Sequence, residues 1–214
     1  MAIVQNPITG RTKGKFASAV FSKQFGKNTM RSKPISVANP RTQLQKEQRA
    51  KFALMVELSR MFLPFLKTSF KQSAVGMSEF NMFMKSNIKN VISGSFPDYA
   101  IDFSELQVSK GSLTGVNMAT ATAVVGSAVE IDWSDNTGVA DAQAADKVLA
   151  LVINPAKATA FSSIGEKTRA DESLELNLPA DWVGDEVYVY IAFNAAESTK
   201  TSNSSFLGDI TVVA

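Results

Sequence analysis

The sequence contains no cysteine and no histidine. Without cysteine the chain can form no disulfide and offers no thiol nucleophile or thiolate ligand. Without histidine it lacks the commonest general base near neutral pH and the commonest ligand of transition metals. These absences exclude histidine-based triads and ordinary zinc sites. We therefore expect no metal, no cofactor and no enzymatic activity.

Long apolar segments are also missing. No window of about 20 residues stays apolar enough to span a bilayer. The first 16 residues lack the apolar run of a secretory signal. We therefore expect no membrane span and a protein that is cytoplasmic as synthesised. Hydrophobic residues make up 45% of the 214 residues and charged residues 20%, which predicts a folded chain with a real core.

The net charge of +2 conceals a division along the chain. Residues 1–51 hold eleven Lys/Arg and one acidic residue, whereas residues 91–214 hold six basic and seventeen acidic residues. Such asymmetry predicts a partner for the basic end. That partner could be nucleic acid, a membrane surface, or the acidic half of a neighbouring copy.

Residues 1–38 are predicted to form a basic arm and a β-hairpin. Gly26 and Asn28 tolerate the positive φ of a tight turn, and Pro34 keeps the chain extended after the hairpin. Phenylalanines are interleaved with cations that are candidates for contact with nucleic acid or a neighbouring subunit. These cations are Arg11, Lys13, Lys15, Lys23, Lys27, Arg31 and Lys33.

Residues 39–96 are predicted to form a helical hairpin. The first helix is expected to begin between Asn39 and Thr42 and to kink or end at Pro64. Its apolar stripe comprises Leu44, Phe52, Met55, Leu58, Phe62 and Leu66. A second helix is expected from about Ser78 to Ser93. Two helices alone rarely bury two apolar stripes, so this unit should pack on the following domain or on other subunits.

Residues 97–214 are predicted to form an acidic antiparallel β-sandwich of immunoglobulin or fibronectin type. Apolar residues alternate with polar ones, and turn signals recur about every eight to twelve residues. The expected strands are IDFSELQV, NMATATAVV, AVEIDW, KVLALVIN, ATAFSSI, ESLELNL, EVYVYIAF and LGDITVV. The predicted fold class is therefore α+β, with a basic arm and β-hairpin, a two-helix unit and a C-terminal sandwich.

Motifs near the N-terminus resemble the signature of an uncharacterised bacterial domain family. They are a Gly-rich hairpin, GRTKGKFASAVFSKQFGKNTMRSKP, then Arg-Ser-x-Pro and Asn-Pro-x-Thr-x-x-Gln-x-x-x-Arg-x-x-Phe. The pattern falls on Arg31, Ser32, Pro34, Asn39, Pro40, Thr42, Gln45, Arg49 and Phe52. SKGSLTG, VEIDW and the fibronectin-like end also fit, so the resemblance covers nearly the whole chain. The family has no established function, so the resemblance implies no catalytic residues.

The densest acidic cluster comprises Glu130, Asp132, Asp135, Asp141 and Asp146. The two-residue period of a strand places Glu130 and Asp132 on one face. A calcium site and paired carboxylates for glycoside hydrolysis are alternatives. No loop matches a calcium template, so we favour a solvated sheet face.

Three aromatic residues are candidates for surface recognition. Trp182 lies in the turn-like PADWVGD, where an exposed ring could bind sugar, although packing in the core is the interpretation that we favour. Tyr188 and Tyr190 share one sheet face, which would form a contact patch if it were the outer face.

Together these patterns predict a non-enzymatic structural protein of a multi-subunit particle. The layout resembles phage particle proteins, which suggests a homo-oligomer located in a virion, with its arm on neighbouring subunits or packaged nucleic acid. One alternative is a sandwich module that binds a glycan or a protein. Another is a protein that binds nucleic acid without reading its sequence.

Overall fold

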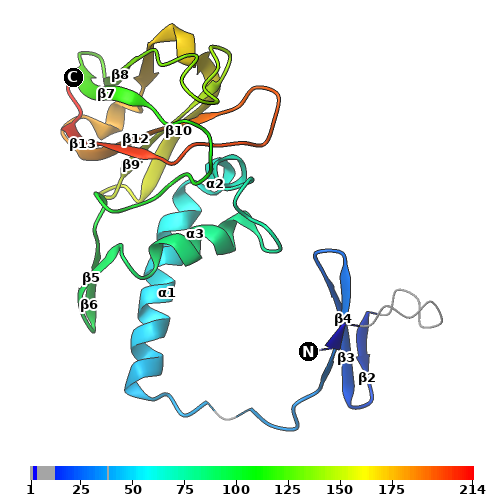
Figure 1. Cartoon of the computed structure of the whole chain (residues 1–214). Coiled ribbons are helices and arrows are strands. Elements are labelled where there is room, and N and C mark those ends of the chain that lie inside the picture. Colours follow the sequence, from blue (N-terminus) through cyan, green and yellow to red (C-terminus); the bar gives the residue numbers. More distant parts are fainter. Residues whose placement is uncertain (1, 4–12, 38) are drawn as a thin grey trace. The chain divides into compact units, whose positions relative to one another are not determined.

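The chain separates into two compact units, Met1–Gln45 and Lys46–Ala214. A computed structural model describes residues 2–3, 13–37 and 39–214 (Figure 1). The N-terminal unit contains a small sheet, and the C-terminal unit contains the remaining strands and almost all of the helical residues.

The N-terminal unit is one four-stranded antiparallel sheet of order β1-β4-β3-β2. Its strands are β1 (Ala2–Ile3), β2 (Gly14–Phe16), β3 (Ala19–Gln24) and β4 (Lys27–Ser32). Phe25 and Gly26 have φ of 48° and 80°, which is typical of the two-residue turn that matches the twist of a hairpin. The expected hairpin is confirmed. Its turn is Phe25–Gly26, and Asn28 lies within β4.

Three helices follow: α1 (Gln43–Met61), α2 (Leu63–Ser69) and α3 (Glu79–Asn87). The hydroxyl of Thr42 accepts a hydrogen bond from the backbone N–H of Gln45 at 3.4 Å, as expected for a cap. Pro64 lies in the first turn of α2, where its missing N–H costs no hydrogen bond. The buried stripe is shorter than expected. It begins at Met55, whereas Leu44 and Phe52 are 76% and 47% exposed.

Helix α3 begins at a cap and ends earlier than the sequence suggests. The hydroxyl of Ser78 accepts a hydrogen bond from the N–H of Asn81. Residues up to Ser93 do not continue the helix, because β5 (Ile92–Ser95) pairs with β6 (Asp98–Ile101). The side chain of Asn87 donates to the carbonyl of Gln107 and accepts from its N–H, which fixes the helix end to the following loop.

The remaining strands form an antiparallel sandwich, which confirms the predicted α+β fold class. Sheet β11-β8-β7 packs on sheet β10-β9-β12-β13. The strands are β7 (Asn117–Val124), β8 (Ala128–Ser134), β9 (Lys147–Asn154), β10 (Thr159–Thr168), β11 (Ser173–Asn177), β12 (Glu186–Asn194) and β13 (Ser205–Thr211). Such a division into sheets of three and four strands is typical of immunoglobulin-like sandwiches.

The predicted strand IDFSELQV is wrong beyond its first residue. Only Ile101 pairs, as the end of β6. The carboxylate of Asp102 accepts hydrogen bonds from the backbone N–H and hydroxyl of Ser104, at 3.0 and 2.6 Å. Such a side-chain turn competes with a strand. The segment then crosses the core as irregular chain, with Leu106 and Val108 buried.

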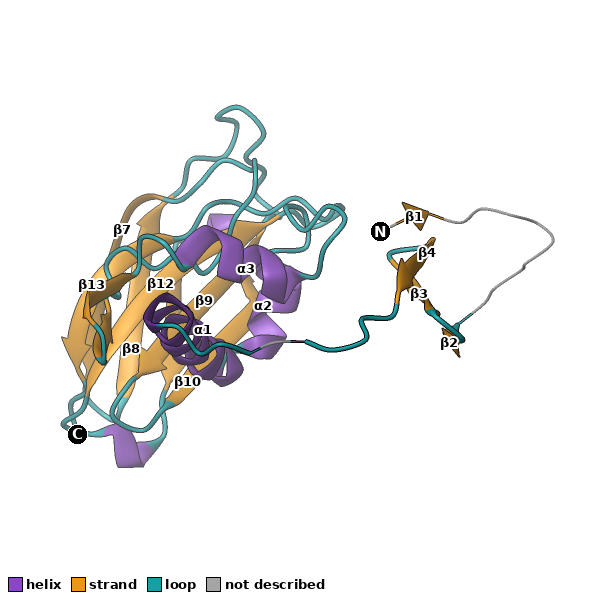
Figure 2. Ribbon diagram, turned by 90° about the horizontal axis from the view of Figure 1, so that it is seen from below, coloured by secondary structure: helices purple, strands orange, loops and turns teal. Residues whose placement is uncertain are grey.

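Sheet β10-β9-β12-β13 is covered on both faces, so the C-terminal unit has three layers (Figure 2). In β9, Leu149 and Leu151 face the helices, whereas Val148 and Ala150 face sheet β11-β8-β7. The helices therefore bury their stripe on the sandwich. The expected domain boundary between residues 96 and 97 is not a division in packing, because both sides share one core within Lys46–Ala214.

Candidate functional site

The N-terminal sheet carries basic residues on one face. Lys15 pairs with Val20, and Val20 pairs with Arg31, so these three side chains share a face. Lys27 lies on the same face, because it is four residues from Arg31 along β4 and side chains alternate with period two. We call Lys15, Lys27 and Arg31 the cationic face.

The opposite face of this sheet is apolar. Phe21 pairs with Met30, and Phe16 pairs with Ala19, which lies two residues before Phe21. We call Phe16, Phe21 and Met30 the apolar face. Phe16 is 76% exposed and Met30 is 36% exposed. Between residues 13 and 45, Thr29 is the only buried residue in the described part of the chain, so the described residues of this unit form no core of their own.

The basic residues predicted to make contacts are divided by this geometry. The cationic face contains three of them. Lys23 points to the other face, opposite Asn28. Lys13 and Lys33 are exposed and flank the sheet, and Arg11 lies outside the described residues.

The favoured interpretation of Trp182, packing in the core, is confirmed, and the alternative of surface recognition is wrong, because the ring is buried. Trp182 is 3% exposed and ends the short 3₁₀ turn η2 (Ala180–Trp182). This turn places the indole in the core between the two sheets, where a large ring contributes most by burial.

Tyr188 and Tyr190 share a face as expected, but the helices cover that face, so the proposed contact patch is also wrong. Tyr190 is fully buried, and its hydroxyl donates to the carbonyl of Phe103 at 2.7 Å. Burial raises the pKa of Tyr190 far above its ordinary value. The ring of Tyr188 stacks on Phe103 at 4.2 Å. A hydrogen bond to Glu186, with burial, raises the pKa of Tyr188 to about 12.

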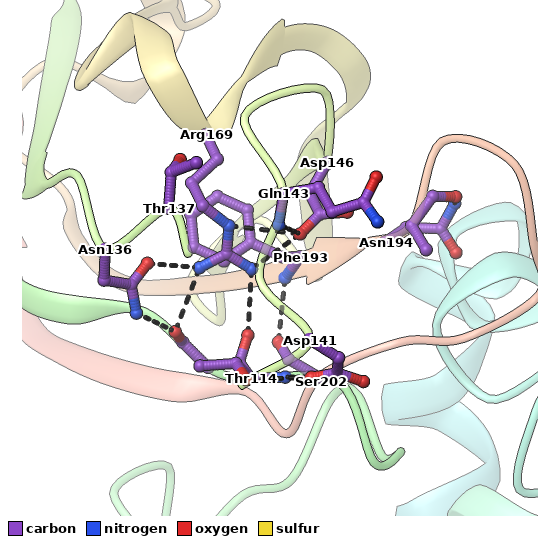
Figure 3. Close-up of polar contacts among 12 residues, drawn as sticks. Thr114, Asn136, Thr137, Asp141, Gln143, Asp146, Arg169, Phe193, Asn194 and Ser202 are labelled. Atoms are coloured by element: carbon purple, nitrogen blue, oxygen red, sulfur yellow. Dashed lines mark hydrogen bonds and ion pairs between the residues drawn. The ribbon is translucent and has the colours of Figure 1, made fainter. Parts of the chain in front are cut away.

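A buried arginine that the sequence analysis did not identify organises one end of the sandwich (Figure 3). Nε and Nη2 of Arg169 donate to Oδ2 of Asp146 at 3.1 and 3.0 Å. Nη2 also donates to the carbonyl of Thr114, and Nη1 donates to the carbonyl of Gly115 and to Oδ1 of Asn136. These five bonds use all five N–H groups of a guanidinium.

An aromatic contact and a second ion pair extend this cluster. The guanidinium of Arg169 lies 3.9 Å from the ring centre of Phe193. Asp141 accepts hydrogen bonds from the hydroxyl and N–H of Thr114 and from Nζ of Lys200, which lower the pKa of Asp141 to about 2. Beside the cluster is a hollow of about 360 Å³, lined in part by Asp141, Asp146 and Lys200. Since these charges are already paired, the cluster stabilises the loops at this end of the sandwich.

The densest acids of the sequence do not converge on one site. Glu130 and Asp132 share the outer face of sheet β11-β8-β7, as expected, and Glu175 lies directly opposite Glu130. We call Glu130, Asp132 and Glu175 the acidic face. Asp135 instead accepts hydrogen bonds from the N–H and hydroxyl of Thr137. In the part of the chain that the structure describes, no acidic residues group in a way that could hold a metal ion.

Among residues 2–3, 13–37 and 39–214, no helix is both long and apolar enough to cross a membrane.

Comparisons with known proteins give a family and distant structural likenesses. No curated protein matches the chain. The fibronectin type III domain of the human collagen alpha-1(XX) chain is 14% identical, with a TM-score of 0.36 over 50% of this chain and 93% of that chain. The fibronectin type III domain of human contactin 1 is 11% identical, with a TM-score of 0.33 over 57% and 94%. A family model matches residues 11–208, and the chain therefore belongs to the family of unknown function DUF6266.

Proposed function

We propose that this protein is a non-enzymatic assembly module, and that its N-terminal unit docks on another subunit of a homo-oligomer. The observation that carries this proposal is the single layer of the N-terminal sheet: among residues 2–3, 13–37 and 39–45, no second layer covers its cationic face or its apolar face. Stable domains normally bury an apolar sheet face against a second layer. A partner surface would supply that layer.

The connection after the sheet adds to the apolar surface that a partner could cover. Ile35 and Val37 follow β4 and are 106% and 77% exposed. Burying a side chain of this size stabilises a complex by about 1.5–3 kcal/mol before the cost of ordering is subtracted. The exposed side chains of Phe16, Ile35 and Val37 therefore favour docking of this small unit.

The loop end of the sandwich supports a structural role for the rest of the chain. Asp146 is paired with Arg169, and Asp141 with Lys200. Charges that are satisfied in this way hold loops in place. From the layout of the chain, we extend the proposal to a phage-derived particle. In it the arm would lie on neighbouring subunits or on packaged nucleic acid.

Nucleic-acid binding is the second candidate, and the cationic face favours it. Lys15, Lys27 and Arg31 lie on one side of a thin sheet, where they could neutralise phosphates without reading bases. Such binding would weaken steeply with added salt.

Light scattering of two proteins at two salt concentrations tests the proposal. The first is the full chain, and the second lacks residues 1–41 and so keeps Thr42 as the cap of α1. We expect the full chain to form oligomers and the truncated chain to be monomeric at about 50 mM salt. A full chain that stays monomeric at concentrations of tens of micromolar would refute the proposal. Salt-sensitive binding of duplex DNA or RNA by that monomer, lost on truncation, would establish the second candidate.

A further inference from the structure

No ion pair between described residues neutralises the charge of the acidic face. Strands β7, β8 and β11 contain no lysine or arginine. Glu130 and Glu175 lie directly opposite each other, and like charges in this arrangement destabilise a sheet. None of the ion pairs in the described part of the chain involves Glu130, Asp132 or Glu175. A cation placed on this face would relieve the repulsion.

The neighbours of these carboxylates are small and polar. Glu130 lies between Glu175 and Thr122, and Asp132 lies between Ser173 and Thr120. The face therefore consists of two cross-strand rows, one with two carboxylates beside a hydroxyl and the other with one carboxylate between two hydroxyls. It offers hydrogen-bond acceptors to an ammonium or guanidinium group, and its rows contain no large apolar side chain to attract the apolar face of the N-terminal sheet.

The long basic side chains of the cationic face can span the carboxylates of the acidic face. Lys15 and Arg31 are two strands apart in one row, about 10 Å at the backbone. Glu130 and Glu175 are one strand apart, about 5 Å, so the planar fork of an arginine such as Arg31 can lie between them and donate to both. The long side chain of Lys15 then reaches along the sheet to Asp132.

The connection to α1 favours a second copy as the partner. Only ten residues separate the end of β4 at Ser32 from the start of α1 at Gln43, which span at most about 36 Å. The acidic face is on the opposite side of the three-layered unit from the helices, across two sheets that are about 10 Å apart. To reach it on its own copy, the chain would have to pass around the edge of the sandwich.

We propose that the acidic face of one copy is the docking surface for the cationic face of a second copy's N-terminal unit. This inference rests on the proposed assembly function and identifies its partner surface. Arg31 inserts between Glu130 and Glu175, and Lys15 contacts Asp132.

A charge exchange between two variants tests the pairing. One variant reverses the arm, Lys15→Glu with Arg31→Glu, and the other reverses the acidic face, Glu130→Lys with Glu175→Lys. Each variant alone should associate at least about tenfold more weakly than the native chain, because like charges then face each other. Mixed together, they should restore association, since the acidic arm of the first fits the basic face of the second, and the native arm of the second fits the native face of the first.

The control is a variant with the same charge change elsewhere, Glu105→Lys with Glu166→Lys, two exposed residues outside the acidic face. It should associate like the native chain, and circular dichroism should show that all variants are folded. An acidic-face variant that still forms native oligomers would overturn the docking surface while leaving the proposed function intact. Loss of association in both variants without recovery on mixing would overturn the pairing. A native chain that is monomeric at low salt would overturn both proposals.

Discussion

Replacing Arg169 with methionine should destabilise the C-terminal unit more than any surface substitution. Methionine keeps much of the volume but removes five hydrogen bonds and one half of a buried ion pair. Asp146, whose side chain is 3% exposed, would keep one partner among the described residues, the N–H of Gln143. Breaking a buried pair from one side costs about 3–5 kcal/mol, and the orphaned carbonyls of Thr114 and Gly115 add to it. Because domains are stable by about 5–15 kcal/mol, this variant should be marginal.

Urea unfolding followed by tryptophan fluorescence measures this effect. Trp133 is a suitable probe, because its Nε1 donates to the backbone carbonyl of Arg169 at 2.7 Å. The double variant Arg169→Met with Asp146→Leu leaves no buried charge unpaired. It should therefore be more stable, by about 2 kcal/mol or more, than the sum of the losses in free energy of unfolding of the two single variants predicts. Lys157→Met is the control. It breaks a pair that is 42% and 68% exposed and should cost under about 1 kcal/mol. Additive losses, or a loss under about 1 kcal/mol for Arg169→Met, would refute the reasoning.

Three further predictions concern separate parts of the chain. The pKa of Asp141 in the folded state is about 2, below its ordinary value, so the stability that its hydrogen bonds contribute is present above about pH 4 and lost as pH falls toward 2. Asp141→Asn should remove this part of the pH dependence when the free energy of unfolding is measured across the acid range. An unchanged acid transition would contradict the prediction. Tyr190→Phe leaves the carbonyl of Phe103 without its hydroxyl donor and should cost about 1 kcal/mol in urea unfolding, whereas no loss would mean that the bond is dispensable. In the proposed assembly the apolar face contacts a surface other than the acidic face, so Phe16→Ser with Met30→Ser should weaken oligomers in light scattering without changing the unfolding midpoint of the C-terminal unit. Native association of this variant would show that the cationic face alone holds the subunits together.

The alternating pattern of the sequence predicts most of the sandwich, and its failures have local causes. KVLALVIN is apolar at nearly every position, and β9 is indeed buried on both faces. IDFSELQV alternates between apolar and polar residues at its start, as a strand would, yet the carboxylate of Asp102 turns the chain. The apolar residues between Asn87 and Ser93 fit a helix by spacing, but tertiary pairing with β6 takes Ile92 into a strand. The hydrophobic pattern of a sequence indicates which side chains are buried, but it does not indicate which other element they pack against.

The candidate sites depend on register, which composition alone does not contain. The excess of basic residues before residue 51 is visible in the sequence, but the grouping of Lys15 with Arg31, and the exclusion of Lys23, follow from two short turns. Arg169 gave no local signal, because the residues that bind its side chain lie 23 to 55 positions away. The size of the Trp182 ring favours burial, but its turn-like neighbours also allow an exposed ring, and the 3₁₀ turn shows that the ring points inward.

The ten-residue connection between Ser32 and Gln43 has a consequence for which oligomers the proposed docking would produce. Donor and acceptor are different surfaces of one chain, so two copies that each donate to the other form a closed, swapped pair. One-way donation leaves a free donor at one end and a free acceptor at the other, which yields a ring or an open filament. Lengthening the connection would widen the set of neighbours that an arm can reach, and shortening it would restrict that set. In the proposed assembly, the length of this connection would therefore set the geometry of the oligomer independently of the affinity between the two faces.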